Sequence, residues 1–155
     1  MGASHYRIAI LQIASLAREV HKEYPNQVRI ACIEDWYVNM RLTIEFFKIK
    51  QNKPDKDFTA PLNFHVVITS EQRAFLEDIW DISSSHVNHL GLDRANYAST
   101  KNTPFLESEL IEASSLILEM SIQFEKYLYG ISDPHADAIK LTNDAAKKYL
   151  SGQFK

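Results

Sequence analysis

The chain has 155 residues, of which 45% are hydrophobic and 24% are charged, and its formal net charge is −3 at pH 7. This length suits one domain over residues 1–155, since two domains would each hold too little core. The composition excludes a mainly disordered chain, and the weak negative charge gives no general attraction for nucleic acid. With 4 glycines and 5 prolines, the chain has too few turn residues for a small, many-turned β-protein.

The cysteine content and the first residues indicate a cellular compartment. Cys32 is the single cysteine, so neither an internal disulfide nor a cysteine-based zinc site is expected. Residues 1–6 lack the basic and apolar regions of a signal peptide. No apolar run approaches the ~18–20 residues of a transmembrane helix. These features predict a cytoplasmic protein without a membrane partner.

The first half of the chain predicts two helices. Apolar residues at 3–4 spacing predict a helix over 5–23, which Pro25 stops because the residue before proline avoids the α region. A second helix is predicted over 27–51, and its two apolar stripes indicate burial against more than one neighbour. The first helix presents Ile10, Ile13, Ala14, Ala17 and Val20; the second presents Ile33, Trp36, Tyr37, Met40, Ile44 and Phe47, with Leu42, Phe46 and Ile49 beside them.

Residues 52–68 contain two prolines and are predicted to form a loop that packs over one end of the bundle. A third helix is expected after Thr69, which has capping-box spacing to Gln72. Three weak helix formers, Ser83–Ser85, interrupt it, and Gly91 is a plausible stop before a polar loop. Its incomplete apolar stripe consists of Ala74, Phe75, Ile79, Ile82 and Leu90.

A fourth helix is predicted from Thr103 as N-cap and Pro104 as first helical residue to Gly130. A fifth, more polar helix over 134–150 repeats this cap-plus-proline start at Asp133. The apolar face of the fourth helix consists of Leu106, Leu110, Ala113, Ile117, Met120, Phe124 and Tyr127. Together these elements predict an all-α fold, a four-helix up-and-down bundle with an additional C-terminal helix.

His86 and His89 are the histidines of chemical interest, because residues three apart share one face of a helix. They would bind a metal if a carboxylate such as Asp78 or Asp93 completed the site. No matching His or Glu pair occurs on another helix, so neither a metal nor another cofactor is expected. The alternatives are a hydrogen-bonded surface pair, or acid–base chemistry in which His89 moves the proton of a ribose 2′-hydroxyl.

Two segments carry a resemblance to a known family. The segment 33–47 (IEDWYVNMRLTIEFF) resembles the long second helix of bacterial HEPN-like proteins, which has the pattern ESFLxHxRxLIEFF. The segment 85–90 (SHVNHL) is similar to their NKxxxHL segment, and the resemblance covers about residues 25–130. It implies a small helical bundle, usually dimeric, of the kind found in toxin–antitoxin and abortive-infection systems.

Many HEPN domains are metal-independent ribonucleases with an arginine, four to six further residues, and a histidine. Carried over, that histidine is His89, and the arginine belongs at 82–84, where this chain has Ile-Ser-Ser. Counted from His86, the corresponding positions 79–81 are Ile-Trp-Asp. The resemblance therefore predicts a degenerate, non-catalytic module. The alternative is a ribonuclease using His89, with His86 or an arginine from elsewhere, Arg41 or Arg94, in support.

Arg41 is the remaining polar feature of the second helix, and it can reach the histidine face or pair with Glu45 one turn later. Arg41, Asn88 and Arg94 are the candidate binding residues. Trp36, Tyr37, Phe46, Phe47 and Trp80 are interpreted as core or dimer-interface residues, since acidic rather than basic residues flank them. Lys48, Lys50, Lys53 and Lys56 form a loose basic cluster, interpreted as a solvated face or a phosphate contact.

Excess apolar surface on the second and fourth predicted helices indicates a homodimer. The leading hypothesis is a HEPN-like module that binds a protein partner or RNA in a bacterial defence or toxin-type system, with no DNA partner expected. The enzyme alternative is the His89 ribonuclease. A second alternative is a helical-bundle metal-binding protein that uses His86 and His89.

Overall fold

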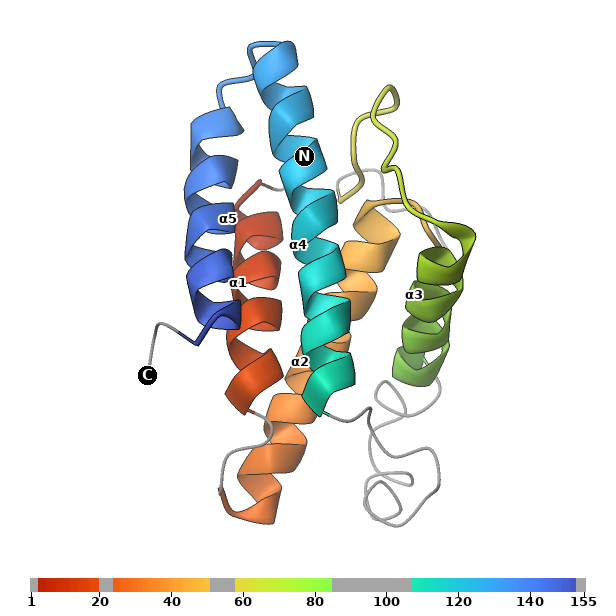
Figure 1. Ribbon diagram of the computed structural model, residues 1–155, viewed down its shortest axis with the longest axis vertical. Coiled ribbons are helices and arrows are strands. Elements are labelled where there is room, and N and C mark those ends of the chain that lie inside the picture. Colours follow the sequence, from red (N-terminus) through yellow and green to blue (C-terminus); the bar gives the residue numbers. More distant parts are fainter. Residues whose placement is uncertain (1–2, 20–23, 51–57, 85–106, 153–155) are drawn as a thin grey trace.

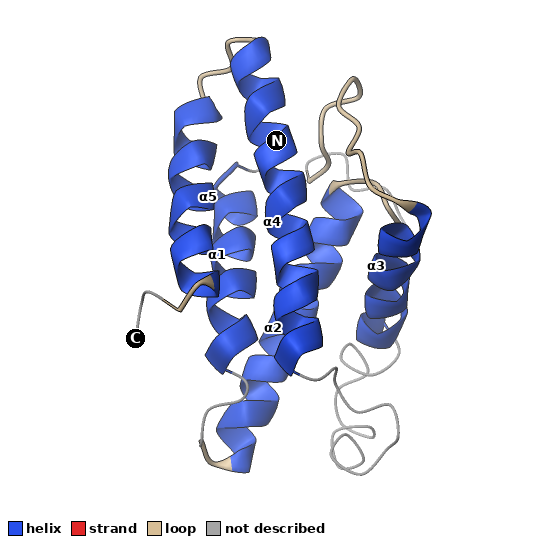
Figure 2. Ribbon diagram, viewed as in Figure 1, coloured by secondary structure: helices blue, strands red, loops and turns tan. Residues whose placement is uncertain are grey.

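The computed structural model describes residues 3–19, 24–50, 58–84 and 107–152. Within these ranges every regular element is a helix and no strand occurs (Figure 2), which confirms the predicted all-α class. The helices are α1 (Ala3–Glu19), α2 (Asn26–Phe46), α3 (Ser70–Ile82), α4 (Glu107–Gly130) and α5 (Ala136–Leu150). None of them is both long enough and apolar enough to cross a lipid bilayer.

Successive helices run in opposite directions along the long axis of the molecule (Figure 1). α1 packs against α2, α4 and α5, and α4 also packs against α5. α3 packs mainly against α2 and makes a smaller contact with α4. The structure is therefore the predicted up-and-down bundle with an additional C-terminal helix, and α3 is its outlying member.

Aromatic side chains fill the centre of the bundle where α1, α2 and α4 meet. Phe124 on α4 is fully buried, and its ring centroid lies 5.4 Å from that of Tyr6 on α1 and 5.4 Å from that of Phe46 on α2. Phe64, from the loop before α3, lies 5.2 Å from Phe124 and closes the cluster from one end. Most of these contacts are tilted or edge-to-face, the geometry that aromatic quadrupoles favour.

The capping box predicted at the start of α3 is present, whereas α5 begins two residues after its predicted start at Pro134 and has His135 in place of Asp133 as N-cap. Thr69 Oγ1 accepts a hydrogen bond from the Gln72 amide, and the Gln72 side chain accepts one from the Thr69 amide, so the capping box is confirmed. Regular helix α5 begins at Ala136, and Asp133 Oδ1 accepts a hydrogen bond from the amide of His135 at 2.8 Å. That hydrogen bond lowers the pKa of Asp133, because it stabilises the ionised carboxylate.

The end of α2 differs from the prediction. The predicted helix continues to residue 51, whereas α2 ends at Phe46. Lys48 has a φ of 60°, and the amides of Lys48 and Ile49 donate to the carbonyls of Glu45 and Ile44. This is a Schellman ending with lysine in the left-handed position where glycine is usual. Because no glycine marks the turn, the sequence pattern did not reveal it.

The loop over 58–69 packs across one end of the bundle, as predicted (Figure 1). The Ala60 amide donates to the carbonyl of Phe46 at 2.9 Å. The Gln123 side chain on α4 bonds the Val67 backbone on both sides: Oε1 accepts from the amide at 2.7 Å, and Nε2 donates to the carbonyl at 2.9 Å. One glutamine therefore fastens the segment that leads into α3 onto α4.

Two residues assigned to apolar stripes are not buried. Leu42 is 40% exposed, and Ala74 is on the exposed face of α3. The buried face of α3 instead consists of Leu76, Ile79 and Trp80, a rotation of the expected stripe that follows from packing against α2. Several predicted features lie outside the described residues: Val20, Leu90, Gly91, Thr103, Pro104 and Leu106.

Candidate functional site

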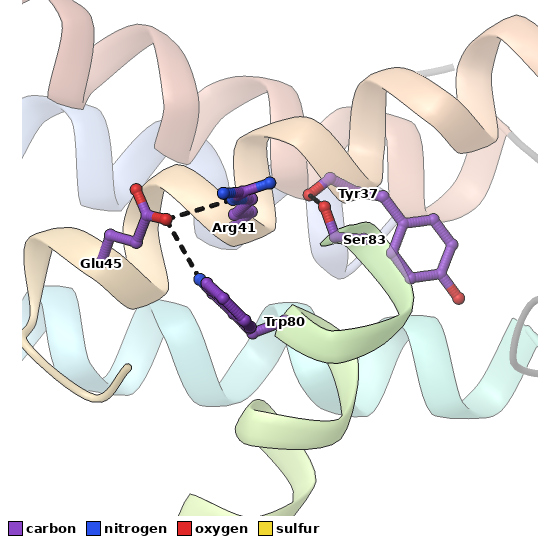
Figure 3. Close-up of polar contacts among 5 residues, drawn as sticks. All are labelled: Tyr37, Arg41, Glu45, Trp80 and Ser83. Carbon is purple, nitrogen blue, oxygen red and sulfur yellow. Dashed lines mark hydrogen bonds and ion pairs between the residues drawn. The ribbon is translucent and has the colours of Figure 1, made fainter. Parts of the chain in front are cut away.

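Of the predicted site residues, Arg41 is in the described part of the chain. His86, Asn88, His89 and Arg94 lie outside it. The site can therefore be built around Arg41, which lies on the face of α2 that packs against α3 (Figure 3).

Arg41 pairs with Glu45 one turn further along α2. Arg41 Nε donates to Glu45 Oε1 at 3.1 Å, and the two side chains are 22% and 24% exposed. The i,i+4 spacing predicted this ion pair, and the structure confirms it. In this arrangement the carboxylate offsets the positive field of the guanidinium, so Arg41 is a weaker anchor for a phosphate than an unpaired arginine.

Trp80 joins this pair from α3. Its indole Nε1 donates to the same Glu45 oxygen at 3.1 Å, and the ring is only 5% exposed (Figure 3). Arg41 Cζ and Lys50 Nζ each lie 5.0 Å from the centroid of the Trp80 ring. Cations at this distance from a partly desolvated indole are attracted by its negative face. The group Arg41, Glu45 and Trp80, which we call the α2–α3 clamp, therefore fixes α3 on α2.

A second polar contact fastens the end of α3. Ser83 Oγ donates to the backbone carbonyl of Tyr37 at 3.2 Å, and Ser83 is fully buried (Figure 3). The backbone widens into a π-type turn at Ser83 and Ser84, directly after regular α3 ends at Ile82. Ser83 therefore works as a structural tether, at a position where the family resemblance places an arginine.

The described lysines of the predicted basic cluster are both engaged within the protein. Lys48 Nζ donates to the carbonyl of Pro61 at 3.1 Å, and Lys50 Nζ donates to Asp81 at 2.6 Å. Lys53 and Lys56 lie outside the described residues. Lys48 and Lys50 are partly exposed and help to hold a loop and α3 in place, and the interpretation of the cluster as a solvated face or a phosphate contact stays a prediction.

The predicted aromatic residues are core residues. Trp36, Tyr37, Phe46, Phe47 and Trp80 are each no more than 5% exposed. Trp36 Nε1 donates to Ser114 Oγ at 3.0 Å, which satisfies the indole inside the bundle. No base can stack on rings at this burial, so the described chain offers none of these five as a nucleic-acid platform.

Sequence reasoning missed a buried polar network between α1, α4 and α5. Tyr6 Oη donates to Ser121 Oγ at 2.6 Å, and Ser121 in turn donates to Asn143. Asn143 Nδ2 donates to Glu125 Oε1 at 3.1 Å and so carries the network to the surface. Burial raises the pKa of Tyr6, which keeps the phenol protonated as a donor. The available signal was the polar pair Ser121 and Asn143 on otherwise apolar helix faces.

Metal-ligating and nucleophilic side chains are scattered. Over the described ranges, no three His, Cys, Asp or Glu side chains come close enough together to hold a metal ion. Cys32 is half-buried, and burial raises the pKa of its thiol, with further contributions from the charges of Glu19 and Asp35. A raised pKa leaves less nucleophilic thiolate, so Cys32 has the environment of an unreactive thiol.

Comparison of the chain with protein-family models, with curated proteins and with solved structures found no match.

Proposed function

We propose that this chain is a HEPN-like helical module that does not cleave RNA and that binds a protein partner in a bacterial defence or toxin-type system in the cytoplasm. The observation that carries the proposal is the α2–α3 clamp. Arg41, an arginine that could replace the one missing before His89, is paired with Glu45 and stacked on Trp80. The contacts between α2 and α3 are enough to explain where the Arg41 side chain lies, and no bound phosphate is needed to explain it.

Charge and burial favour a protein over RNA as the partner. The chain carries a net charge of −3, and RNA binding draws its affinity from unpaired cations that neutralise phosphates. Lys50 and Lys140 are paired with Asp81 and Asp144, as Arg41 is with Glu45. The five aromatic residues considered above as stacking platforms are buried in the core. These features support a protein-binding scaffold.

Purified protein incubated with total RNA in EDTA is expected to leave the RNA intact, because Arg41, the candidate arginine in the described part of the chain, is already paired with Glu45. The readout is gel electrophoresis over time at equimolar protein, with His89→Ala as the matched variant. RNA cleavage that disappears in His89→Ala would overturn the proposal and establish the metal-independent ribonuclease. Tight RNA binding without cleavage would also overturn it, in favour of an RNA-binding module.

We also propose that the chain forms a homodimer through the outer face of α2. Val28, Val38 and Leu42 lie on this face and are 44%, 38% and 40% exposed. Positions 28, 38 and 42 belong to one series with steps of three and four residues along α2, so they share one side of the helix and a second copy could cover all three. Multi-angle light scattering at micromolar concentration should give the mass of two chains.

The double variant Val38→Glu, Leu42→Glu should then be a monomer, because two carboxylates at the interface repel their copies in the partner chain. Leu141→Glu is the matched control: Leu141 is 66% exposed on α5, away from that stripe. It should leave the dimer unchanged. A monomeric wild-type protein at micromolar concentration would contradict the proposal, and so would a control that dissociates as fully as the double variant.

A further inference from the structure

A groove of about 590 Å³ lies between α3 and α4. We call it the α3–α4 groove; its lining residues are Thr69, Glu71, Gln72, Phe75, Glu112, Ser115, Leu116 and Glu119. α3 leans on α2 through the α2–α3 clamp and makes only a small contact with α4. The groove is therefore a consequence of how α3 is held, and it has the volume of an ordinary ligand cleft.

One end of the groove is fixed by hydrogen bonds. Gln123, one turn beyond Glu119 on α4, holds both backbone groups of Val67. Thr69 and Gln72 are held by the capping box at the start of α3. Because these contacts fix both the incoming segment and the first turn of α3, the groove is a preformed feature of the bundle.

The rim of the groove is acidic. Glu71, Glu112 and Glu119 are exposed, and among its lining residues in the described ranges there is no lysine, arginine or histidine. In the described part of the chain these three carboxylates make no ion pair or hydrogen bond, whereas Glu45 and Asp81 pair with Arg41 and Lys50. Three neighbouring carboxylates without a counter-charge create a negative potential that attracts a cation.

The floor of the groove is apolar. Phe75 is half-buried, and Leu116 is 8% exposed, so each presents part of its side chain to the groove. An apolar floor beneath an acidic rim distinguishes this surface from an ordinary solvated acidic face. It favours a ligand with an apolar side chain between positive charges, which would gain from both burial and charge pairing.

We propose that the α3–α4 groove binds a short basic peptide segment of a partner protein, in which an apolar side chain is flanked by arginine or lysine. This inference rests on the proposed protein-binding function and names its site and the chemistry of its partner. The apolar side chain contacts Phe75 and Leu116. The flanking cations pair with Glu71, Glu112 and Glu119.

The spacing of the carboxylates sets the spacing of the cations. Glu112 and Glu119 are seven residues apart on α4, which corresponds to about 10.5 Å along the helix axis. An extended peptide covers that distance in about three to four residues, and its side chains at i, i+2 and i+4 share one face, so cations at i and i+4 around a central apolar side chain at i+2 reach both carboxylates. Each such pair is exposed and individually weak, so we expect weak binding whose affinity falls further as the salt concentration rises.

Fluorescence anisotropy tests the proposal with a fluorescein-labelled peptide in which one leucine has an arginine two residues before it and another two residues after it. The full chain should bind it at low salt and lose most of the binding at high salt. The triple variant E71Q/E112Q/E119Q keeps the shape of the groove and removes its charge, and it should weaken binding by about tenfold or more. S115R, which puts a cation inside the groove, should abolish binding.

The matched control is Asp144→Asn, since Asp144 is an exposed carboxylate on α5. It should change the affinity by less than about twofold, and circular dichroism should show that all variants are folded. Equal binding by wild type and the triple variant would overturn the proposal. Binding of a peptide with glutamates in place of the arginines would overturn it too. If the groove bound spermidine through its carboxylates and did not bind the peptide, the proposal would be overturned in favour of a polyamine site. The RNA assay is a separate test, so failure of this site and failure of the proposed function remain distinguishable.

Discussion

Replacing Trp80 with alanine should lower the free energy of unfolding by about 3–5 kcal/mol, the usual range for removing a buried tryptophan. The indole is 5% exposed and donates to Glu45 across the α2–α3 interface. The ring also lies beside Arg41 and Lys50, so its loss removes two cation–ring contacts in addition to the buried packing. Urea unfolding followed by circular dichroism measures the change.

Trp80→Phe is the matched variant, because it keeps an aromatic ring and removes the N–H donor to Glu45. It should cost about 1–2 kcal/mol, the scale of one hydrogen bond to a charged group together with a modest loss of packing. α3 contacts mainly α2, so in Trp80→Ala the amides of α3 should also lose hydrogen-exchange protection before those of α1. An Ala variant as stable as wild type would show that the clamp does not hold α3.

The sequence pattern was sufficient where one face of a helix is buried. On α4 the residues Leu110, Ala113, Ile117, Met120 and Phe124 were predicted as core, and each is no more than 1% exposed. Apolar periodicity reports burial directly in such a helix. On α2 the same argument failed for Leu42, because the pattern cannot show where along the helix a stripe loses its neighbour: Phe46 and Ile49 of the same stripe are buried. The prediction of where α2 ends failed for another reason. Lys48 adopts a left-handed backbone conformation, which is uncommon for lysine and could not be recognised from the sequence.

The candidate site shows the same limit. Arg41 and Glu45 are one turn apart, so local spacing predicted their ion pair. Trp80 is 35 residues from Glu45 in the sequence, and its hydrogen bond depends on how α3 is rotated against α2. The α3–α4 groove depends on that rotation as well, because its residues come from two helices that barely touch. Contacts within one helix were predictable, and contacts set by the placement of helices were not.

Replacing Phe124 with alanine should also cost about 3–5 kcal/mol, for a different physical reason. The ring is fully buried, and its centroid lies within 5.2–6.4 Å of four other aromatic rings. These four are Tyr6, Phe46, Phe47 and Phe64, from α1, α2, the turn after α2 and the loop before α3. Alanine would leave a cavity that all of these segments border. For a chain of this length the melting temperature should fall by about 10 °C.

Phe58→Ala is the matched control within the same cluster. Phe58 is half-buried, and among the described rings it is in contact with Phe46, at 5.3 Å, so its loss should cost about 1–2 kcal/mol. Calorimetry and urea unfolding should both show that Phe124→Ala loses more stability than Phe58→Ala. If Phe58→Ala were the more damaging variant, the core could not be centred on Phe124. If the expected order holds, the ring that joins α4 to α1, α2 and the loop is what makes these segments unfold together.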